Sequence, residues 1–201
     1  YENFACDLLV DKEVVFALFD TQKKIQKRYF QNYLSEVGGY VEVIGYADDL
    51  GMQDRPQISP ETYHEMIMPY HTEIFAYIHE LADVKILLHS CGAVYPLLED
   101  LIKAGVDVLN PVQTRAAGMN PFDLKRDFGG RLSFWGGFDE QMTLPRGTVK
   151  EIEEEVLSLF KSLAPGGGYI FAPSHNVQED TPPENIVAMY EAAYKYGKYA
   201  V

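Results

Sequence analysis

A chain of 201 residues, of which 47% are apolar and 23% charged, is long enough to bury one substantial core, and this composition excludes a disordered protein. A formal net charge of −13 argues against nucleic acid as a partner, and no apolar run approaches the ~20 residues needed to span a membrane. The only cysteines, Cys6 and Cys91, lie far apart in the sequence, so we expect free thiols, a core position for Cys6 and a cytoplasmic location.

Helix and strand signals alternate along the chain. Apolar residues recur at helical spacing over residues 11–37, which predicts a long helix near the N-terminus. Short segments that are apolar on both faces predict five strands, as is typical of a parallel sheet covered by helices. The expected strands span residues 40–46, 85–88, 106–109, 132–135 and 169–172.

Capping residues mark the starts of the helices between these strands. Ser59 and Asn120 each precede a proline, and the segments that begin at Thr148 and Thr181 both fit a capping box. Pro69 should kink or break the helix that follows Ser59. A surface or packing role is expected for the three histidines of that helix, His64, His71 and His79.

Polar residues follow each expected strand. The carboxyl ends of parallel strands meet at one edge of the sheet, where α/β barrels build their active sites, so these residues should converge on one pocket. We predict a substrate-binding role for Asp48, Asn110, Gln113 and Asp139. The glycines that follow Trp135 fit either the floor of this pocket or a simple tight turn.

The segment His89-Ser90-Cys91-Gly92 follows the second expected strand. Side chains alternate along a strand, so His89 and Cys91 should point to the same side, and Gly92 lets the backbone turn sharply. The pair fits half of a zinc site, or a reactive thiol beside its base. The alternative without chemistry is a small buried thiol next to a histidine that is bonded to a carbonyl group.

Five strands do not close a barrel that needs eight. We therefore expect one incomplete TIM (β/α)8 domain over residues 1–201, which covers roughly the C-terminal five βα units and lacks the N-terminal part. The missing strands would come from a longer chain, from a partner chain or from a homo-oligomer, since an open sheet edge invites pairing.

Four segments resemble the uroporphyrinogen decarboxylase (URO-D) superfamily, which includes the cobalamin-dependent methyltransferases of the methylcobalamin:coenzyme M type. They are residues 1–4 with the helix that follows, 45–51, 89–92, and 172–176 leading into 181–185. The resemblance covers essentially the whole chain. It implies a TIM barrel, of which this chain would form roughly the C-terminal half to two-thirds.

The methyltransferase branch has a zinc site built from a His-x-Cys pair and a later cysteine. The resemblance implies that His89 and Cys91 are metal ligands. At the position of the later cysteine this chain has His175, which departs from the branch's pattern, but histidine is itself a good zinc ligand. Asp49 or Asp48 would be a fourth ligand or would orient an imidazole. The implied enzyme uses Zn2+, with His175 and Asp49 in catalytic roles, and transfers a methyl group between a small-molecule thiol and methylcobalamin on a corrinoid protein partner.

The decarboxylase branch, which acts in porphyrin and heme biosynthesis, explains the same residues differently. In that branch a histidine before a Pro-Glu helix start contacts the substrate, and His175 matches it. The branch has no His-x-Cys pair, however, and its arginine-rich motif lies near an N-terminus that this chain lacks, while Arg115, Arg131 and Arg146 are scattered. The sequence therefore favours the methyltransferase over the decarboxylase. A non-catalytic barrel fragment that acts as an assembly subunit is the third alternative.

Overall fold

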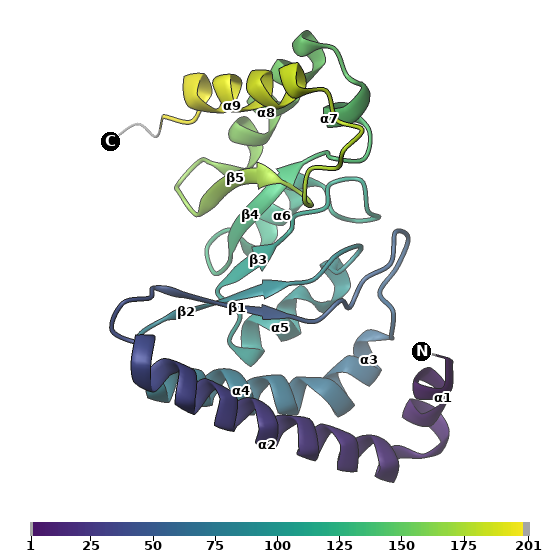
Figure 1. Ribbon diagram of the computed structural model, residues 1–201. Coiled ribbons are helices and arrows are strands. Elements are labelled where there is room, and N and C mark those ends of the chain that lie inside the picture. Colours follow the sequence, from purple (N-terminus) through teal and green to yellow (C-terminus); the bar gives the residue numbers. More distant parts are fainter. Residues whose placement is uncertain (1, 199–201) are drawn as a thin grey trace.

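The computed structural model describes residues 2–198 and contains a five-stranded parallel sheet with helices between successive strands (Figure 1). The strands pair in the order β1-β2-β3-β4-β5, and every pair is parallel. Their bounds are β1 (Val43–Ala47), β2 (Lys85–His89), β3 (Val108–Asn110), β4 (Ser133–Phe138) and β5 (Tyr169–Pro173). The α/β class is confirmed, and the sheet is that of an incomplete TIM barrel.

The helices pack along one side of this sheet, from α2 and α4 at one end to α8 and α9 at the other (Figure 1). Their bounds are α1 (Glu2–Val10), α2 (Lys12–Val37), α3 (Pro60–Thr62), a π-helix (Tyr63–Ile67), α4 (Met68–Leu81), a 3-10 helix (Tyr95–Leu97), α5 (Leu98–Ala104), α6 (Pro121–Phe128), α7 (Thr143–Arg146), α8 (Val149–Leu163) and α9 (Pro183–Tyr196). The expected disturbance at Pro69 is confirmed, because the π-helix ends at Ile67, two residues before it, and Pro69 lies in the first turn of α4. Within residues 2–198, no helix has both the length and the apolar character to cross a membrane.

Three of the four predicted helix starts are confirmed and one is wrong. Ser59, Asn120 and Thr148 cap their helices through side-chain oxygens, and Thr148 forms the complete capping box. Helix α9 instead begins one residue later than expected, with Pro182 as its N-cap residue and no side-chain cap. The reason is that the residue before a proline is disfavoured in helical geometry, so Pro182 stays outside the helix and Thr181 cannot cap it.

The two faces of the sheet differ in burial. Ile86, Leu88 and Phe134 point toward the helices and are fully buried in the main core. On the opposite face, Val43 is 39% exposed and Ile170 is 43% exposed, because the described residues provide no layer that covers them. A closed barrel would bury this second face, so the interior side of the barrel is open here.

The N-terminal helix α1 contributes little to this core. Its only buried residue, Leu8, packs with Val15 and Met66 in a small separate cluster. Cys6 lies on the exposed side of α1, so the predicted core position for this cysteine is wrong.

Candidate functional site

The loops that follow β1 and β2 are joined by hydrogen bonds between their residues. The hydroxyl of Ser90, which is fully buried, accepts from the backbone N–H of Leu50 at 2.9 Å. One carboxylate oxygen of Asp49 accepts from the backbone N–H of Cys91 at 3.0 Å. These bonds bring the acidic residue that follows β1 next to the thiol that follows β2.

Glycine is required where the two loops cross. A Cβ atom on Gly51 would lie 2.8 Å from the backbone nitrogen of Ala93 and would collide with the carbonyl oxygen of Cys91. Gly92 has a φ of 85° and meets the backbone of Gly51 in the same way. The close approach of the two backbones therefore depends on both glycines.

Asp49, His89 and Cys91 form a cluster in which one potential metal-ligand atom from each residue lies within 4.8 Å of the others. The Cys91 Sγ and His89 Nε2 atoms are 3.7 Å apart. Two ligands of a tetrahedral zinc ion, at the usual Zn–S and Zn–N bond lengths, are about 3.6 Å apart, so the pair has the spacing that zinc requires. The chemistry and spacing of the three donors therefore fit a zinc site with an open fourth position.

The surroundings of Cys91 bear on which of its two chemical roles is favoured. Burial raises the pKa of the Cys91 thiol, and the carboxylates of Asp49 and Glu140 raise this pKa further. A free nucleophilic cysteine needs the opposite effect, because its thiolate must form near neutral pH. The acidic neighbours favour a bound cation, so the environment suits a metal ligand better than an unassisted nucleophile.

Asn110 and Gln113 both contact the His-Ser-Cys-Gly segment. The side-chain oxygen of Asn110 lies 2.7 Å from Nδ1 of His89, and the side-chain oxygen of Gln113 accepts from the backbone N–H of Gly92 at 2.7 Å. Both side chains hold the segment in place. The substrate-binding roles predicted for them stay predictions.

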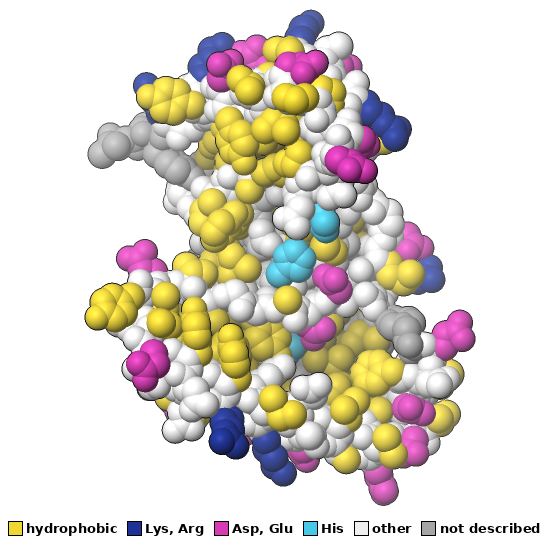
Figure 2. Space-filling view, in the orientation of Figure 1, with side chains coloured by type: hydrophobic (Ala, Val, Ile, Leu, Met, Phe, Trp, Pro, Cys, Tyr) yellow, Lys and Arg dark blue, Asp and Glu magenta, His cyan; other side chains and the backbone are white. Residues whose placement is uncertain are grey.

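His175 lies on the wall of the same cavity as His89 but outside the donor cluster, which among the described residues contains only Asp49, His89 and Cys91. The cavity measures about 530 Å³ and opens on the uncovered face of the sheet. The His175 ring is exposed, and its Nδ1 lies 3.4 Å from the Asn176 carbonyl oxygen. Figure 2 shows histidine and acidic side chains near the middle of this face, with hydrophobic side chains around them. The roles predicted for His175, as ligand and as catalytic residue, stay predictions.

Trp135 also lines this cavity, whereas the two glycines after it have another function. Gly136 and Gly137 continue strand β4 with φ values of 119° and 96°, so this segment is not a tight turn. A Cβ atom on Gly136 would lie 3.1 Å from the backbone nitrogen of Val112. The loop after β3, and not a ligand, is what approaches this glycine closely.

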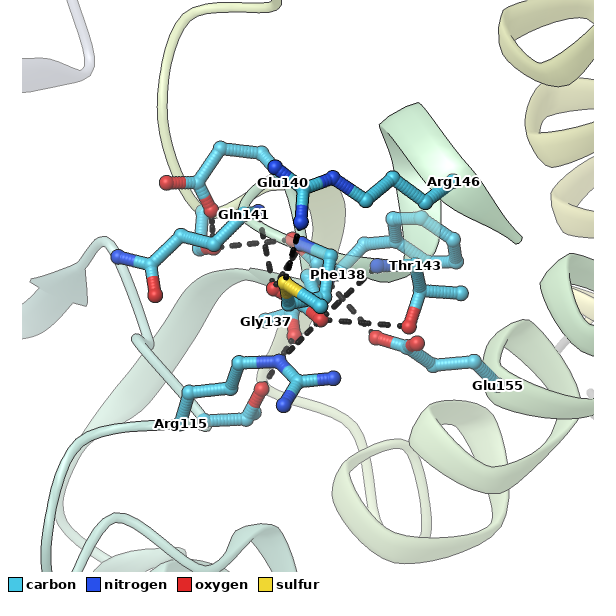
Figure 3. Close-up of polar contacts among 12 residues, drawn as sticks. Arg115, Gly137, Phe138, Glu140, Gln141, Thr143, Arg146 and Glu155 are labelled. Carbon is cyan, nitrogen blue, oxygen red and sulfur yellow. Dashed lines mark hydrogen bonds and ion pairs between the residues drawn. The ribbon is translucent and has the colours of Figure 1, made fainter. Parts of the chain in front are cut away.

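Asp139 is buried at the start of the loop after β4, and Figure 3 shows Arg115, Gln141, Thr143 and Glu155 around this loop. The Asp139 carboxylate accepts hydrogen bonds from the backbone N–H groups of Gln141 and Thr143 and from the guanidinium of Arg115. Glu155 reaches the same loop from α8 and accepts from the backbone N–H of Asp139 at 2.8 Å. Asp139 thereby organises the loop, and the substrate-binding role predicted for it stays a prediction.

The carboxylate of Asp48 contacts a buried histidine. Nε2 of His71 lies 3.2 Å from Asp48, and Nδ1 of His71 lies 3.0 Å from the hydroxyl of Tyr63, which is fully buried. The packing role expected for His71 is therefore confirmed. The contact ties the segment after β1 to α4, while the predictions that Asp48 binds substrate or metal stay predictions.

The sequence analysis missed several residues of this site. Ser90 and Glu155 stabilise the loops of the site through hydrogen bonds to residues that are distant in the sequence, and a short sequence motif does not predict such bonds. Gly51 carried a usable signal, because a glycine close to a strand end can mark a place where another backbone approaches closely.

Comparisons with known proteins decide the family. A sequence model of the family described as "Uroporphyrinogen decarboxylase (URO-D)" matches residues 1–196, which is nearly the whole chain. The chain belongs to the uroporphyrinogen decarboxylase family. The superfamily that the sequence motifs predicted is therefore confirmed.

Individual URO-D family members are distant relatives of this chain. The uroporphyrinogen decarboxylase of Synechocystis sp. is 27% identical over 138 residues, which are 68% of this chain and 37% of that protein. The uroporphyrinogen decarboxylase of Legionella pneumophila (strain Paris) is 27% identical over 140 residues, which are 69% of this chain and 38% of that protein. The chain thus spans less than two fifths of the length of these relatives.

A solved structure extends the URO-D family comparison to the fold. A methyltransferase from Methanosarcina mazei superposes on 98% of this chain and 54% of its own, with a TM-score of 0.77 and 21% sequence identity. The likeness establishes the common fold and confirms that the five strands belong to a barrel of this type.

Proposed function

We propose that this protein is a zinc-dependent methyltransferase that moves a methyl group between a small-molecule thiol and a corrinoid carried by a partner protein. The observation that carries the proposal is the cluster of Asp49, His89 and Cys91 at the carboxyl ends of β1 and β2. Its sulfur, nitrogen and oxygen donors are those that zinc prefers, and active sites of TIM barrels lie at this end of the strands.

The residues of the site have different roles in this reaction. Asp49, His89 and Cys91 would hold the ion, and zinc bound there supplies the Lewis acidity that lowers the pKa of a substrate thiol. We assign the thiol proton to His175, which lies on the wall of the same cavity as His89. The deprotonated sulfur would then form a bond to the methyl carbon, while the bond between that carbon and the corrinoid breaks and the corrinoid keeps the electron pair. Trp135 and the strand-end residues around it form the wall of the cavity in which this methyl transfer would occur.

The charges around the cavity support a methyl-transfer substrate over a polycarboxylate. Within residues 2–198 the cavity wall contains no lysine or arginine, and Asp49 and Glu140 act on the thiol of Cys91 as negative charges. A tetrapyrrole polycarboxylate would need concentrated positive charge there. The acidic surroundings instead attract a divalent cation.

Decarboxylation of uroporphyrinogen is the second candidate function. The names of the two relatives described above favour it, although their identity to this chain is only 27%. The two reactions differ in their products, so incubation of the protein with methylcobalamin and thiols, and separately with uroporphyrinogen, discriminates between them. Methylated thiol is the expected product, whereas release of carbon dioxide from uroporphyrinogen would overturn the proposal.

We place this reaction in the cytoplasm. Cys6 and Cys91 are both free thiols in the structure, and a protein whose chemistry depends on a cysteine ligand requires a reducing compartment.

Zinc content after metal loading and desalting tests the proposal, and the chain offers a matched pair of variants. Cys91→Ala removes a proposed ligand, whereas Cys6→Ala removes the other free cysteine, which is exposed on α1. We expect the wild type and Cys6→Ala to retain stoichiometric zinc. Cys91→Ala should lose more zinc affinity than the ~10–100-fold that is lost when a residue hydrogen-bonded to a metal ligand is changed. Equal zinc retention by the two variants would show that Cys91 is not a ligand.

A further inference from the structure

His89 and Asn110 face each other on neighbouring strands. The two residues are register partners at the carboxyl ends of β2 and β3, and Oδ1 of Asn110 lies 2.7 Å from Nδ1 of His89. The backbone also ties the strands together here, since the N–H of Ser90 donates to the carbonyl of Asn110 at 2.7 Å. The imidazole of His89 and the amide of Asn110 are therefore held in fixed relative positions.

A carbonyl group determines which way the Asn110 amide points. The other end of the amide lies 3.3 Å from the backbone carbonyl oxygen of Trp135, and a carbonyl oxygen only accepts hydrogen bonds. The atom that faces Trp135 must be the NH2 group, because the reverse orientation would set two acceptors against each other. The amide oxygen of Asn110 is thereby directed at His89.

This orientation fixes the proton on the imidazole. An amide oxygen only accepts, so the hydrogen bond at 2.7 Å requires that Nδ1 of His89 carries the proton. In a neutral imidazole the other nitrogen, Nε2, then has a free lone pair. Nε2 is the atom that lies 3.7 Å from Cys91 Sγ, so the lone pair belongs to the nitrogen in the donor cluster.

We infer that Asn110 is a positioning residue that selects the His89 tautomer with the proton on Nδ1 and so makes Nε2 available as a metal ligand. The contacts run from the Trp135 carbonyl through Asn110 to His89, which belongs to the donor cluster. The inference rests on the proposed function only for the identity of the metal. The tautomer itself is a property of the metal-free protein.

The direct test is a long-range 1H–15N correlation spectrum of the metal-free protein labelled with 15N-histidine, recorded well above the ordinary histidine pKa of about 6.5. We expect a protonated Nδ1 for His89 in the wild type and in Asn110→Asp, which keeps an acceptor oxygen. Asn110→Leu should shift His89 toward the tautomer with the proton on Nε2. A wild-type His89 with its proton on Nε2, or an unchanged tautomer in Asn110→Leu, would overturn the inference.

Zinc or cobalt(II) titration gives the second readout. We expect Asn110→Leu to bind the metal ~10–100-fold more weakly than the wild type and Asn110→Asp to retain most of the affinity. Thr114→Val is the matched control, because Thr114 lies in the same loop and donates to the Gly137 carbonyl without contacting His89. Equal affinity in the wild type and Asn110→Leu would contradict the inference and leave the proposed function standing. Failure of the wild type to bind metal would instead contradict the proposed function, while the tautomer spectrum would still decide the role of Asn110.

Discussion

The surroundings of the loop after β4 shift the pKa values of two carboxylates, Glu155 and Asp139, in opposite directions. Burial raises the pKa of Glu155, and the charge of Asp139 raises it further. Burial also raises the pKa of Asp139, but the hydrogen bonds from Arg115 and from the N–H groups of Thr143 and Gln141 outweigh this effect and lower it overall. The loop therefore raises the pKa of Glu155 and lowers that of Asp139.

This pair predicts how stability depends on pH. A carboxyl group whose pKa is raised by folding binds more protons in the folded state, so its contribution is present below its unfolded pKa, 4.5 for Glu155, and is lost as the pH rises through the folded pKa. The difference in the free energy of unfolding between the wild type and Glu155→Gln should therefore shift against the wild type as the pH rises over this range. Folding lowers the pKa of Asp139, so its contribution to the free energy of unfolding is present above its unfolded pKa and is lost as the pH falls through the folded pKa.

Denaturant unfolding at a series of pH values between about 4 and 8 measures this difference. Glutamine keeps an oxygen that can accept from the N–H of Asp139, so the loop contact survives in Glu155→Gln. Parallel stability profiles of the two proteins would show that Glu155 has the same pKa in the folded and unfolded chain.

At the scale of elements, the loops after β1 and β2 depend on backbone contact at Gly51. Gly51→Ala would push a methyl group into the Cys91 carbonyl and the Ala93 nitrogen, both of which are backbone atoms that cannot move aside cheaply. We expect a loss of about 1–3 kcal/mol in the free energy of unfolding, as for other overpacked sites, together with weaker zinc binding.

Gly130→Ala is the control for this prediction. Gly130 is an exposed glycine, and a Cβ atom on it would meet nothing within 4 Å. Thermal and denaturant unfolding of both variants should show that only Gly51→Ala is destabilised. Equal stability of the two variants would mean that the loops are free to separate.

The sequence could predict the strands but not all of their ends. All five predicted strands are present, because short segments that are apolar on both faces are typical of strands in a parallel sheet covered by helices. The third strand begins at Val108 and not at residue 106, because the N–H of Val106 still bonds to Leu101 in the turn that ends α5. The first begins at Val43, where pairing with β2 starts, and leaves Tyr40 89% exposed.

The sequence likewise predicts the location of the site but not the contacts of its residues. The side chains of His89 and Cys91 lie close together, as the alternation of side chains along a strand predicts, although β2 itself ends at His89. The partner of Cys91 comes from the loop after β1, and the partners of His89 and Gly92 come from the end of β3 and the loop that follows it. Their identity depends on strand register, which a single sequence does not display. The sequence motifs therefore locate the site but do not assign the roles of Asn110 and Gln113.

At the scale of the whole molecule, the sheet formed by residues 2–198 has two free edges and one face that no described residue covers. β1 and β5 each pair with one neighbour, and Val43 and Ile170 expose apolar surface on the open face. Unpaired edges and apolar faces favour association with another chain.

We therefore expect the 201-residue chain, expressed by itself, to associate at micromolar concentration. Association should strengthen with added salt, because screening weakens the repulsion between chains that each carry a formal charge of −13. Sedimentation velocity at several salt concentrations measures this. A monodisperse monomer at high salt would show that the open face needs no partner.

The most direct test of the account is anomalous X-ray diffraction at the zinc absorption edge from crystals of the zinc-loaded protein. The account predicts a single strong peak within bonding distance of His89 Nε2, Cys91 Sγ and a carboxylate oxygen of Asp49. A zinc-loaded crystal with no peak at these three atoms, or with its peak elsewhere in the molecule, would contradict it.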